Sequence, residues 1–132
     1  MKSGDTFLIK YPRDTFHLFV VVSAPESLPD VIFPDRVFLV MITTREAWKD
    51  NSCILRRNEH PFLKHDSVAA FDSPPSLWTT LEHLQDLKKQ KRLIEKEPVT
   101  ESVLQRLRNC YADSDYQKDT IFQFLFRQGV VK

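Results

Sequence analysis

With 132 residues, of which 42% are hydrophobic, the chain is long enough for one hydrophobic core and too short for two, so we expect a single domain spanning 1–132. The net charge of +1 excludes a uniformly basic nucleic-acid-binding protein, because phosphate contacts must then come from a local patch. Residues 88–108 form a basic block, for which a solvated helix face is the simpler explanation.

The N-terminal half of the chain has the pattern of short strands. Runs rich in Val, Ile, Phe and Leu alternate with clusters of Pro, Asp, Asn and Ser, and the prolines between 24 and 35 indicate a loop. Five strands in succession predict a small β-barrel or a strongly bent sheet over about 3–75. The expected strands are 6–10, 17–23, 36–43, 53–57 and 67–71.

The C-terminal half has helical periodicity, so the fold class is α+β. A capping-box spacing from Thr79 to Glu82 predicts a helix over roughly 79–91, and 92–97 is a link or short strand. Thr100 is the expected N-cap of a second helix that ends near Ala112, which closes a helical part over about 79–112.

A third, extra helix is expected over about 115–128, with Gly129 ending it. Its aromatic residues Phe122, Phe124 and Phe126 fall on more than one helical face. They indicate either a subunit or partner interface, or burial across the open end of the barrel.

The two cysteines predict nothing beyond ordinary thiols. Cys53 and Cys110 lie far apart, have no zinc-binding spacing, and do not make a disulfide framework, so we expect reduced cysteines in an intracellular protein. The N-terminus lacks the apolar stretch of a signal peptide, and no segment is long and apolar enough to cross a bilayer. These features predict a cytoplasmic protein that does not enter a membrane.

Several chemistries are disfavoured by what the chain lacks. Gly4 and Gly129 are its only glycines, which argues against a nucleophile elbow, a phosphate-cradling loop and a dinucleotide fingerprint. His60, His65 and Asp66 have no diagnostic metal-binding spacing. We therefore expect no metal and no cofactor.

Metal-free RNA cleavage fits the residues that are present. The 2′-hydroxyl of RNA is the nucleophile in this reaction, so a protein need supply only proton transfer, a cation and hydroxyls that hold the phosphate. Taken singly, each candidate also has an ordinary structural role at a strand end or in a turn. Candidates for proton transfer are His17, His60 and His65; cations are Arg13, Arg45, Arg56 and Arg57; hydroxyls are Thr43, Thr44 and Ser67.

The order of several phrases resembles the PemK/MazF family of toxins from bacterial toxin–antitoxin modules. The resemblance covers residues 3–112 and leaves the tail as an addition. It is carried by residues 3–9 (SGDTFLI), 17–23 (HLFVVVS), 41–44 (MITT), 63–68 (LKHDSV) and the expected helix at 100–112.

The resemblance implies an SH3-like barrel with added helices, usually a homodimer, that cleaves single-stranded RNA without metal and is neutralised by an antitoxin. Thr43 matches the family's strand-end threonine at the scissile phosphate, and Asp66 and Ser67 match its Asp-Ser step. Active members usually have Arg-Pro where this chain has His17 and Leu18, so His17 is the expected acid or base and Arg13 the substitute cation. The expected RNA-binding residues are Thr44, Arg45, Arg56, Lys64, His65, Asp66 and Ser67.

Three functions remain open from the sequence. The first is a metal-independent endoribonuclease toxin. The second is a non-catalytic barrel that binds a protein partner or nucleic acid, since a fold does not fix a function. The third is a poison of another enzyme, as in the related gyrase-binding toxins, which would act through the aromatic C-terminal helix at Phe124 and Phe126.

Overall fold

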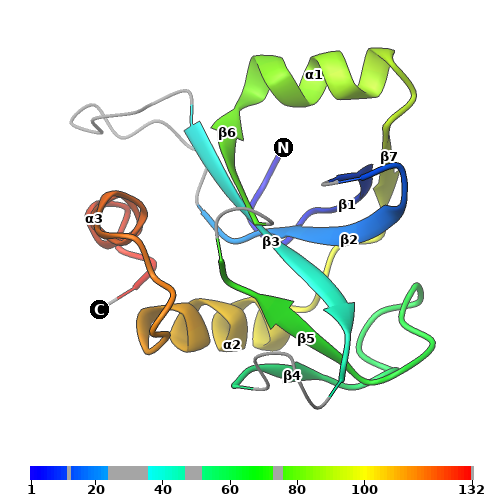
Figure 1. The fold of residues 1–132 in the computed structure, drawn as a ribbon. Helices are drawn as coiled ribbons and strands as arrows, with labels where there is room; N and C mark the ends of the chain where they lie inside the picture. Colours follow the sequence, from blue (N-terminus) through cyan, green and yellow to red (C-terminus); the bar gives the residue numbers. More distant parts are fainter. Residues whose placement is uncertain (12, 24–35, 47–51, 73–75, 132) are drawn as a thin grey trace.

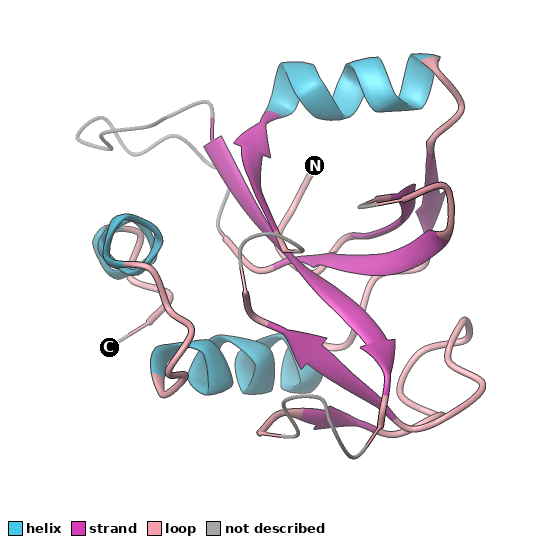
Figure 2. Cartoon of the chain, viewed as in Figure 1, coloured by secondary structure: helices cyan, strands magenta, loops and turns pink. Residues whose placement is uncertain are grey.

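The structure is a computed structural model that describes residues 1–11, 13–23, 36–46, 52–72 and 76–131. They form an α+β fold of one seven-stranded antiparallel sheet and three helices (Figures 1 and 2). The strands are β1 (Thr6–Lys10), β2 (Phe16–Val21), β3 (Arg36–Thr44), β4 (Ile54–Leu55), β5 (Ser67–Ala70), β6 (Leu77–Thr80) and β7 (Leu93–Lys96). The helices are α1 (Leu81–Lys89), α2 (Glu101–Ala112) and α3 (Asp119–Arg127).

The sheet has the strand order β4-β5-β3-β2-β1-β7, and β6 pairs with β3 beside this path. The first half of β3 pairs with β6 and its second half pairs with β5, so two short strands share one edge of a long one. Of the two arrangements expected from the sequence, the closed barrel is not formed by the described strands. β4 has only two residues and pairs with β5, while β7 at the opposite end pairs with β1, so the two edges do not meet.

Alternating side chains divide the apolar residues of the sheet between its two faces. On β3, Phe38, Val40 and Ile42 belong to the cluster under α2 and α3, whereas Leu39 and Met41 belong to the cluster under α1. Figure 1 shows α1 and α2 on opposite sides of the sheet. The expectation of one core is therefore wrong, because a single sheet buried on both faces provides two.

The five strands predicted in the N-terminal half are confirmed, although β4 is shorter than expected. The loop expected at 24–35 lies outside the described residues. Thr100 is the N-cap of α2, as predicted, and its side chain accepts a hydrogen bond from the Val103 N–H at 3.3 Å.

The start of the first helix was predicted wrongly. Residues 79 and 80 belong to β6, which the sequence analysis missed, and α1 is capped by Thr80, whose side chain accepts from the His83 N–H. The hydrogen-bonded pairing of Leu77–Thr80 with the first half of β3 overrides the helical pattern there.

The third helix is shorter than predicted, spanning Asp119–Arg127. Phe124 is buried, and its ring packs edge-on against Trp78 with centroids 4.8 Å apart, while Phe126 is 53% exposed and stacks on Phe122. Phe124 is thus a core residue, which leaves only part of the aromatic set for a partner. No helix among the described residues has the length and apolarity needed to cross a bilayer.

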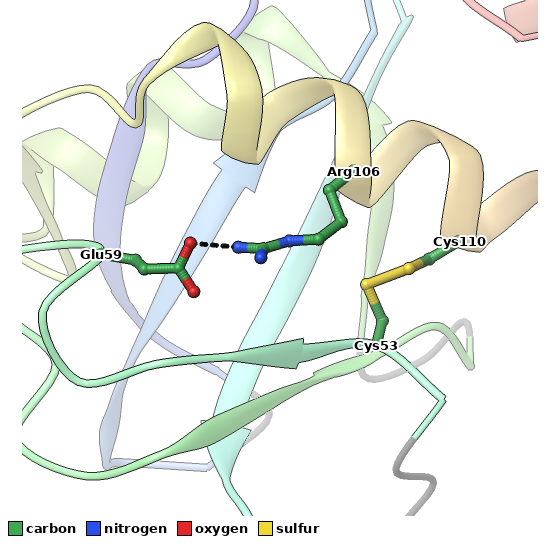
Figure 3. The surroundings of a disulfide bond; sticks show 4 residues. All are labelled: Cys53, Glu59, Arg106 and Cys110. Atoms are coloured by element: carbon green, nitrogen blue, oxygen red, sulfur yellow. Dashed lines mark hydrogen bonds and ion pairs between the residues drawn. A yellow bond between two sulfur atoms is a disulfide. The ribbon is translucent and has the colours of Figure 1, made fainter.

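Cys53 and Cys110 form a disulfide, so the expectation of reduced cysteines is wrong (Figure 3). The bond joins the residue before β4 to α2, across a sequence separation of 57 and with Cα atoms 5.9 Å apart. The spacing of the two cysteines in the sequence does not indicate the disulfide, because the packing of α2 on the sheet brings Cys110 close to Cys53. The expectation of a cytoplasmic protein rested in part on free thiols, and it loses that support.

Removing the disulfide should lower the free energy of unfolding by about 4 kcal/mol, because a cross-link over this separation restricts the unfolded chain. The measurement is denaturation by guanidinium chloride of the oxidised protein, the reduced protein and the Cys53→Ala/Cys110→Ala double variant. Reductant should leave the double variant unchanged. Equal midpoints for the oxidised and reduced natural protein would contradict the prediction.

Tyr111 lies at the centre of the core between α2 and the sheet. Its ring contacts those of Phe38 and Phe71, with centroids 4.9 and 5.5 Å away, and its hydroxyl accepts a hydrogen bond from the Lys118 N–H at 3.0 Å. Burial raises the pKa of the Tyr111 phenol above its usual value of 10.0, and the hydrogen bond from Lys118 opposes the shift only partly.

Because the folded pKa of Tyr111 is the higher one, the unfolded chain ionises first as the pH rises. The contribution of Tyr111 to the free energy of unfolding should therefore be constant below pH about 10 and decrease above it. The decrease is at most about 1.4 kcal/mol for each unit by which the pKa of Tyr111 in the folded chain exceeds that in the unfolded chain. Denaturation curves across this range should show a weaker fall for Tyr111→Phe. Tyr116→Phe is the matched control, because Tyr116 is exposed; an identical pH dependence in all three proteins would exclude a role for Tyr111.

Candidate functional site

The topology gathers the predicted site residues at one end of the sheet, which we call the polar end and define as residues 13, 17, 43–45, 56 and 64–67. Lys10 pairs with Phe16, so the turn that contains Arg13 and the start of β2 that contains His17 lie there. β3 runs antiparallel to β2 and β5, so Thr43 and Thr44 reach the same end beside Ser67. Residues that are scattered over 13–67 in the sequence thus lie at the same end of the sheet.

His17 is half-buried at the start of β2 and is held by one defined contact. Its Nδ1 lies 3.1 Å from the carbonyl oxygen of Tyr11, which can only accept, so Nδ1 carries the hydrogen and donates it. The lone pair of the neutral ring is then on Nε2. A backbone carbonyl on Nδ1 is the arrangement that fixes the tautomer of a histidine able to accept a proton at its other nitrogen.

Thr43 belongs to the strand next to His17. The last pair of the β2–β3 ladder is Leu18 with Ile42, and His17 and Thr43 are each one residue beyond that pair on their own strand. On its other side Thr43 pairs with Val68 of β5. An imidazole and a hydroxyl therefore come from neighbouring strands at the polar end.

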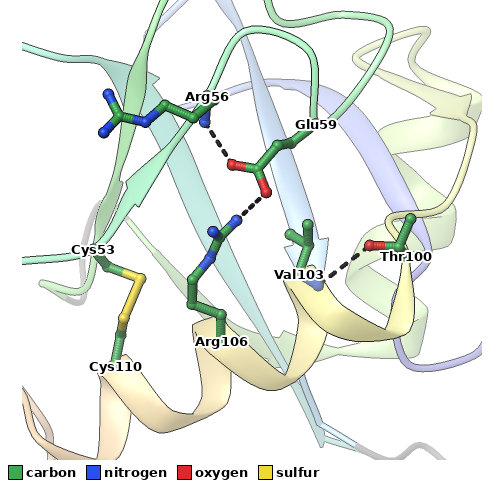
Figure 4. A network of polar contacts seen from close by, with 7 residues as sticks. All are labelled: Cys53, Arg56, Glu59, Thr100, Val103, Arg106 and Cys110. Atoms are coloured by element: carbon green, nitrogen blue, oxygen red, sulfur yellow. Dashed lines mark hydrogen bonds and ion pairs between the residues drawn. A yellow bond between two sulfur atoms is a disulfide. The ribbon is translucent and has the colours of Figure 1, made fainter.

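A series of polar contacts, which runs through side chains and the backbone amide of Arg56, links the polar end to α2 (Figure 4). Arg56 Nη1 lies 2.8 Å from Asp66 Oδ2, and the Arg56 N–H donates to Glu59 Oε1 at 2.7 Å. Arg106 of α2 donates to the other carboxylate oxygen of Glu59. The sequence analysis missed Glu59 and Arg106, because nothing in their spacing indicates that α2 lies beside the segment after β4.

The segment 64–67 contributes in two different ways. Lys64 and His65 are exposed, whereas Ser67 is buried and its hydroxyl donates to the His65 carbonyl at 3.2 Å. The Asp66 carbonyl accepts from the Arg45 N–H at 3.0 Å, which joins the end of β3 to the start of β5. Ser67 therefore stabilises the turn, while Lys64 and His65 present their side chains to solvent.

His60, a candidate for proton transfer by sequence, has a structural role. It is buried, its Nδ1 accepts from the Phe62 N–H at 3.0 Å, and its Nε2 donates to the Glu97 carbonyl, which also accepts from the Thr6 hydroxyl. The ring is therefore neutral, with its hydrogen on Nε2. It fastens the segment after β4 to the segment before α2.

No group of three or more His, Cys, Asp or Glu side chains suited to a metal occurs among the residues that the structure describes. Cavities of about 420, 470 and 640 Å³ are lined by described residues outside the polar end. Most side chains of the polar end are exposed, namely those of Arg13, Thr44, Arg45, Arg56, Lys64 and His65. Such a surface suits an extended polymer better than a small molecule.

Comparison of the chain with protein-family models and with curated proteins gives no match.

Replacing His60 by Ala should lower the free energy of unfolding by about 2 to 4 kcal/mol, because it removes two buried hydrogen bonds and a packed ring. His65→Ala is the matched control, since His65 is exposed; it should change stability by less than about 0.5 kcal/mol. Chemical denaturation of the two variants provides the comparison. Equal stabilities would show that His60 does not have the structural role assigned to it.

Proposed function

We propose that the protein is a metal-independent endoribonuclease that cleaves single-stranded RNA at the polar end of its sheet. The observation that carries the proposal is the environment of His17, whose Nδ1 is engaged by the Tyr11 carbonyl so that Nε2 is the basic nitrogen. Thr43 on the adjacent strand supplies a hydroxyl, and several arginines and a lysine occupy the same end.

The reaction needs no group that the chain lacks. Nε2 of His17 takes the proton of a 2′-hydroxyl, and the resulting oxygen attacks the adjacent phosphorus. A bond forms between that oxygen and phosphorus while the bond to the 5′-oxygen breaks. The leaving 5′-oxygen takes a proton from water, and His17 then releases its added proton to the resulting hydroxide. The products are a 2′,3′-cyclic phosphate and a 5′-hydroxyl. The Thr43 hydroxyl and the Arg13 guanidinium are the groups we assign to the charge that develops on the phosphate.

Binding of the strand would depend on the exposed cations of the polar end. Arg45, Arg56 and Lys64 are exposed. Arg56 forms a solvent-accessible ion pair with Asp66, and an RNA phosphate can replace the Asp66 carboxylate at a small cost in free energy. Phe62, 39% exposed and two residues before Lys64, offers a ring face on which a base can stack.

The family assignment belongs to the same proposal. A β-rich N-terminal half followed by a helix packed on the sheet supports a fold of the PemK/MazF type, although the described strands of this chain form an open sheet and not a barrel. On this basis we propose a homodimer and an antitoxin that occupies the polar end. An antitoxin segment of acidic composition would compete with RNA for the same cations.

The test is cleavage of a long single-stranded RNA in the presence of a chelator, with the ends of the products identified by mass spectrometry. Wild-type protein should yield 2′,3′-cyclic phosphates. His17→Ala should lower the rate by about 10² to 10⁴-fold, and Thr43→Ala by about a hundredfold. His83→Ala, which removes an exposed histidine of α1, should leave the rate unchanged.

Two results would exclude catalysis by this site. One is the absence of cleavage above background by the wild-type protein with chelator present. The other is an equal rate for His17→Ala and the wild-type protein.

A non-catalytic binding module is the second candidate. It is favoured by one observation: the His17 ring is hydrogen-bonded to a backbone carbonyl, a contact that a histidine with a purely structural role also makes. This candidate predicts RNA or partner binding that is weakened by Arg56→Ala, with no cleavage products from the wild-type protein. The cleavage assay therefore separates the two candidates.

A further inference from the structure

Arg108 is a buried cation on α2 with an incomplete set of partners. Only 8% of the residue is exposed, and its Nε donates to the carbonyl oxygen of Val22, just beyond the end of β2, at 2.8 Å. Among the described residues no carboxylate lies within ion-pair distance of its guanidinium. An anion that pairs with the remaining donors of a guanidinium of such low exposure would be stabilising.

The two terminal nitrogens of Arg108 retain access to solvent. No described group accepts a hydrogen bond from either nitrogen. In the described structure every fully buried side-chain nitrogen or oxygen has a hydrogen-bond partner, so a nitrogen without one is not fully buried. Both nitrogens must therefore be accessible. Burial lowers the pKa of Arg108, an effect that the charge of Glu101 opposes, and this agrees with a guanidinium short of negative charge.

Arg108 is one of the residues that line a cavity of about 640 Å³ between α2 and the end of the described chain. Polar side chains of α2, including Gln105 and Asn109, line it together with Arg108, and Val130 and Val131 supply apolar surface. Its volume is within the range of small-molecule sites.

The apolar wall of the cavity is positioned by the turn that ends α3. Gly129 has φ +74, and the Val130 N–H donates to the Leu125 carbonyl while the Gly129 N–H donates to that of Phe126, which is the Schellman pattern. A Cβ at Gly129 would meet no atom within 4 Å, so the cavity is open at this point.

The residues that line the cavity favour one kind of anion over another. Arg108 provides one deeply placed positive charge, whereas Asp113, exposed, places a negative charge on the same cavity. A multiply charged phosphate would be repelled by Asp113, while a single carboxylate could pair with the guanidinium at two points. Val130 and Val131 add affinity for an apolar group attached to that carboxylate.

We propose that this cavity is a binding site for a small carboxylate with an apolar body, whose acid group pairs with the terminal nitrogens of Arg108. It is separate from the polar end, because Val22 follows β2 at the end of the strand opposite to His17. The proposal therefore does not depend on RNA cleavage.

Benzoate is the probe, and the backbone amide shifts of the whole protein are the readout. We expect saturable shifts at Gln105, Asn109 and Val130 with a Kd of about 1 mM or lower. Benzamide, which has the same shape without the charge, should cause no saturable shifts. Benzoate shifts that do not saturate, or equal binding of benzamide, would overturn the proposal.

Three variants sharpen the test. Arg108→Gln should weaken benzoate at least tenfold, while Arg127→Gln, which removes an exposed arginine of α3 outside the cavity, should not. Asp113→Asn should strengthen binding by roughly twofold to fivefold, because it removes the opposing charge. If Arg108→Gln does not fold, the Asp113→Asn variant and benzamide test the proposal instead. An affinity for benzoate that is unchanged in Asp113→Asn would then contradict the proposed site. Tighter binding of inorganic phosphate than of benzoate would contradict the assignment to carboxylates.

Discussion

β3 pairs with β2 along one edge and with β6 and then β5 along the other, so this nine-residue strand holds three others in register. Its six buried residues from Val37 to Ile42 alternate between the two faces. Each face then needs a helical cover, which α1 provides on one side and α2 with α3 on the other. A charge anywhere in the middle of β3 would therefore disturb both cores and both edges at once.

α2 is the second element on which distant parts of the chain converge. Within two turns it carries Arg106, which binds Glu59; Arg108, which binds the Val22 carbonyl; Cys110, which is bonded to Cys53; and Tyr111, which packs against Phe38 and Phe71. These contacts reach the segment after β4, the end of β2 and the centre of the sheet. The helix thus fixes both the segment that carries Arg56 and the cavity in which Arg108 lies.

The two proposed sites occupy different environments for a physical reason. The Arg56–Asp66 pair of the polar end is exposed, so water screens it and a phosphate can exchange with the Asp66 carboxylate. Arg108 itself is buried, and at such a position a charge interacts more strongly and an unmatched one is less tolerable. A polymer can use the first kind of surface, whereas the second suits one small group.

Much of the fold follows from local pattern. Apolar runs bounded by turn residues determined five strands, and Thr100 followed by a helical apolar stripe determined α2, because propensity and capping act over a few residues. The sequence also brought the polar residues around His17 and Thr43 together as candidates, since antiparallel strands in succession return to the same end. Only the tertiary structure decided that the sheet stays open and that Leu77–Thr80 is a strand. It also decided that Cys53 meets Cys110 and that His60 and Ser67 are structural while Arg108 is left with an accessible charge. Each of these depends on contacts between residues far apart along the chain, and spacing in the sequence contains no information on which distant surfaces will pack together.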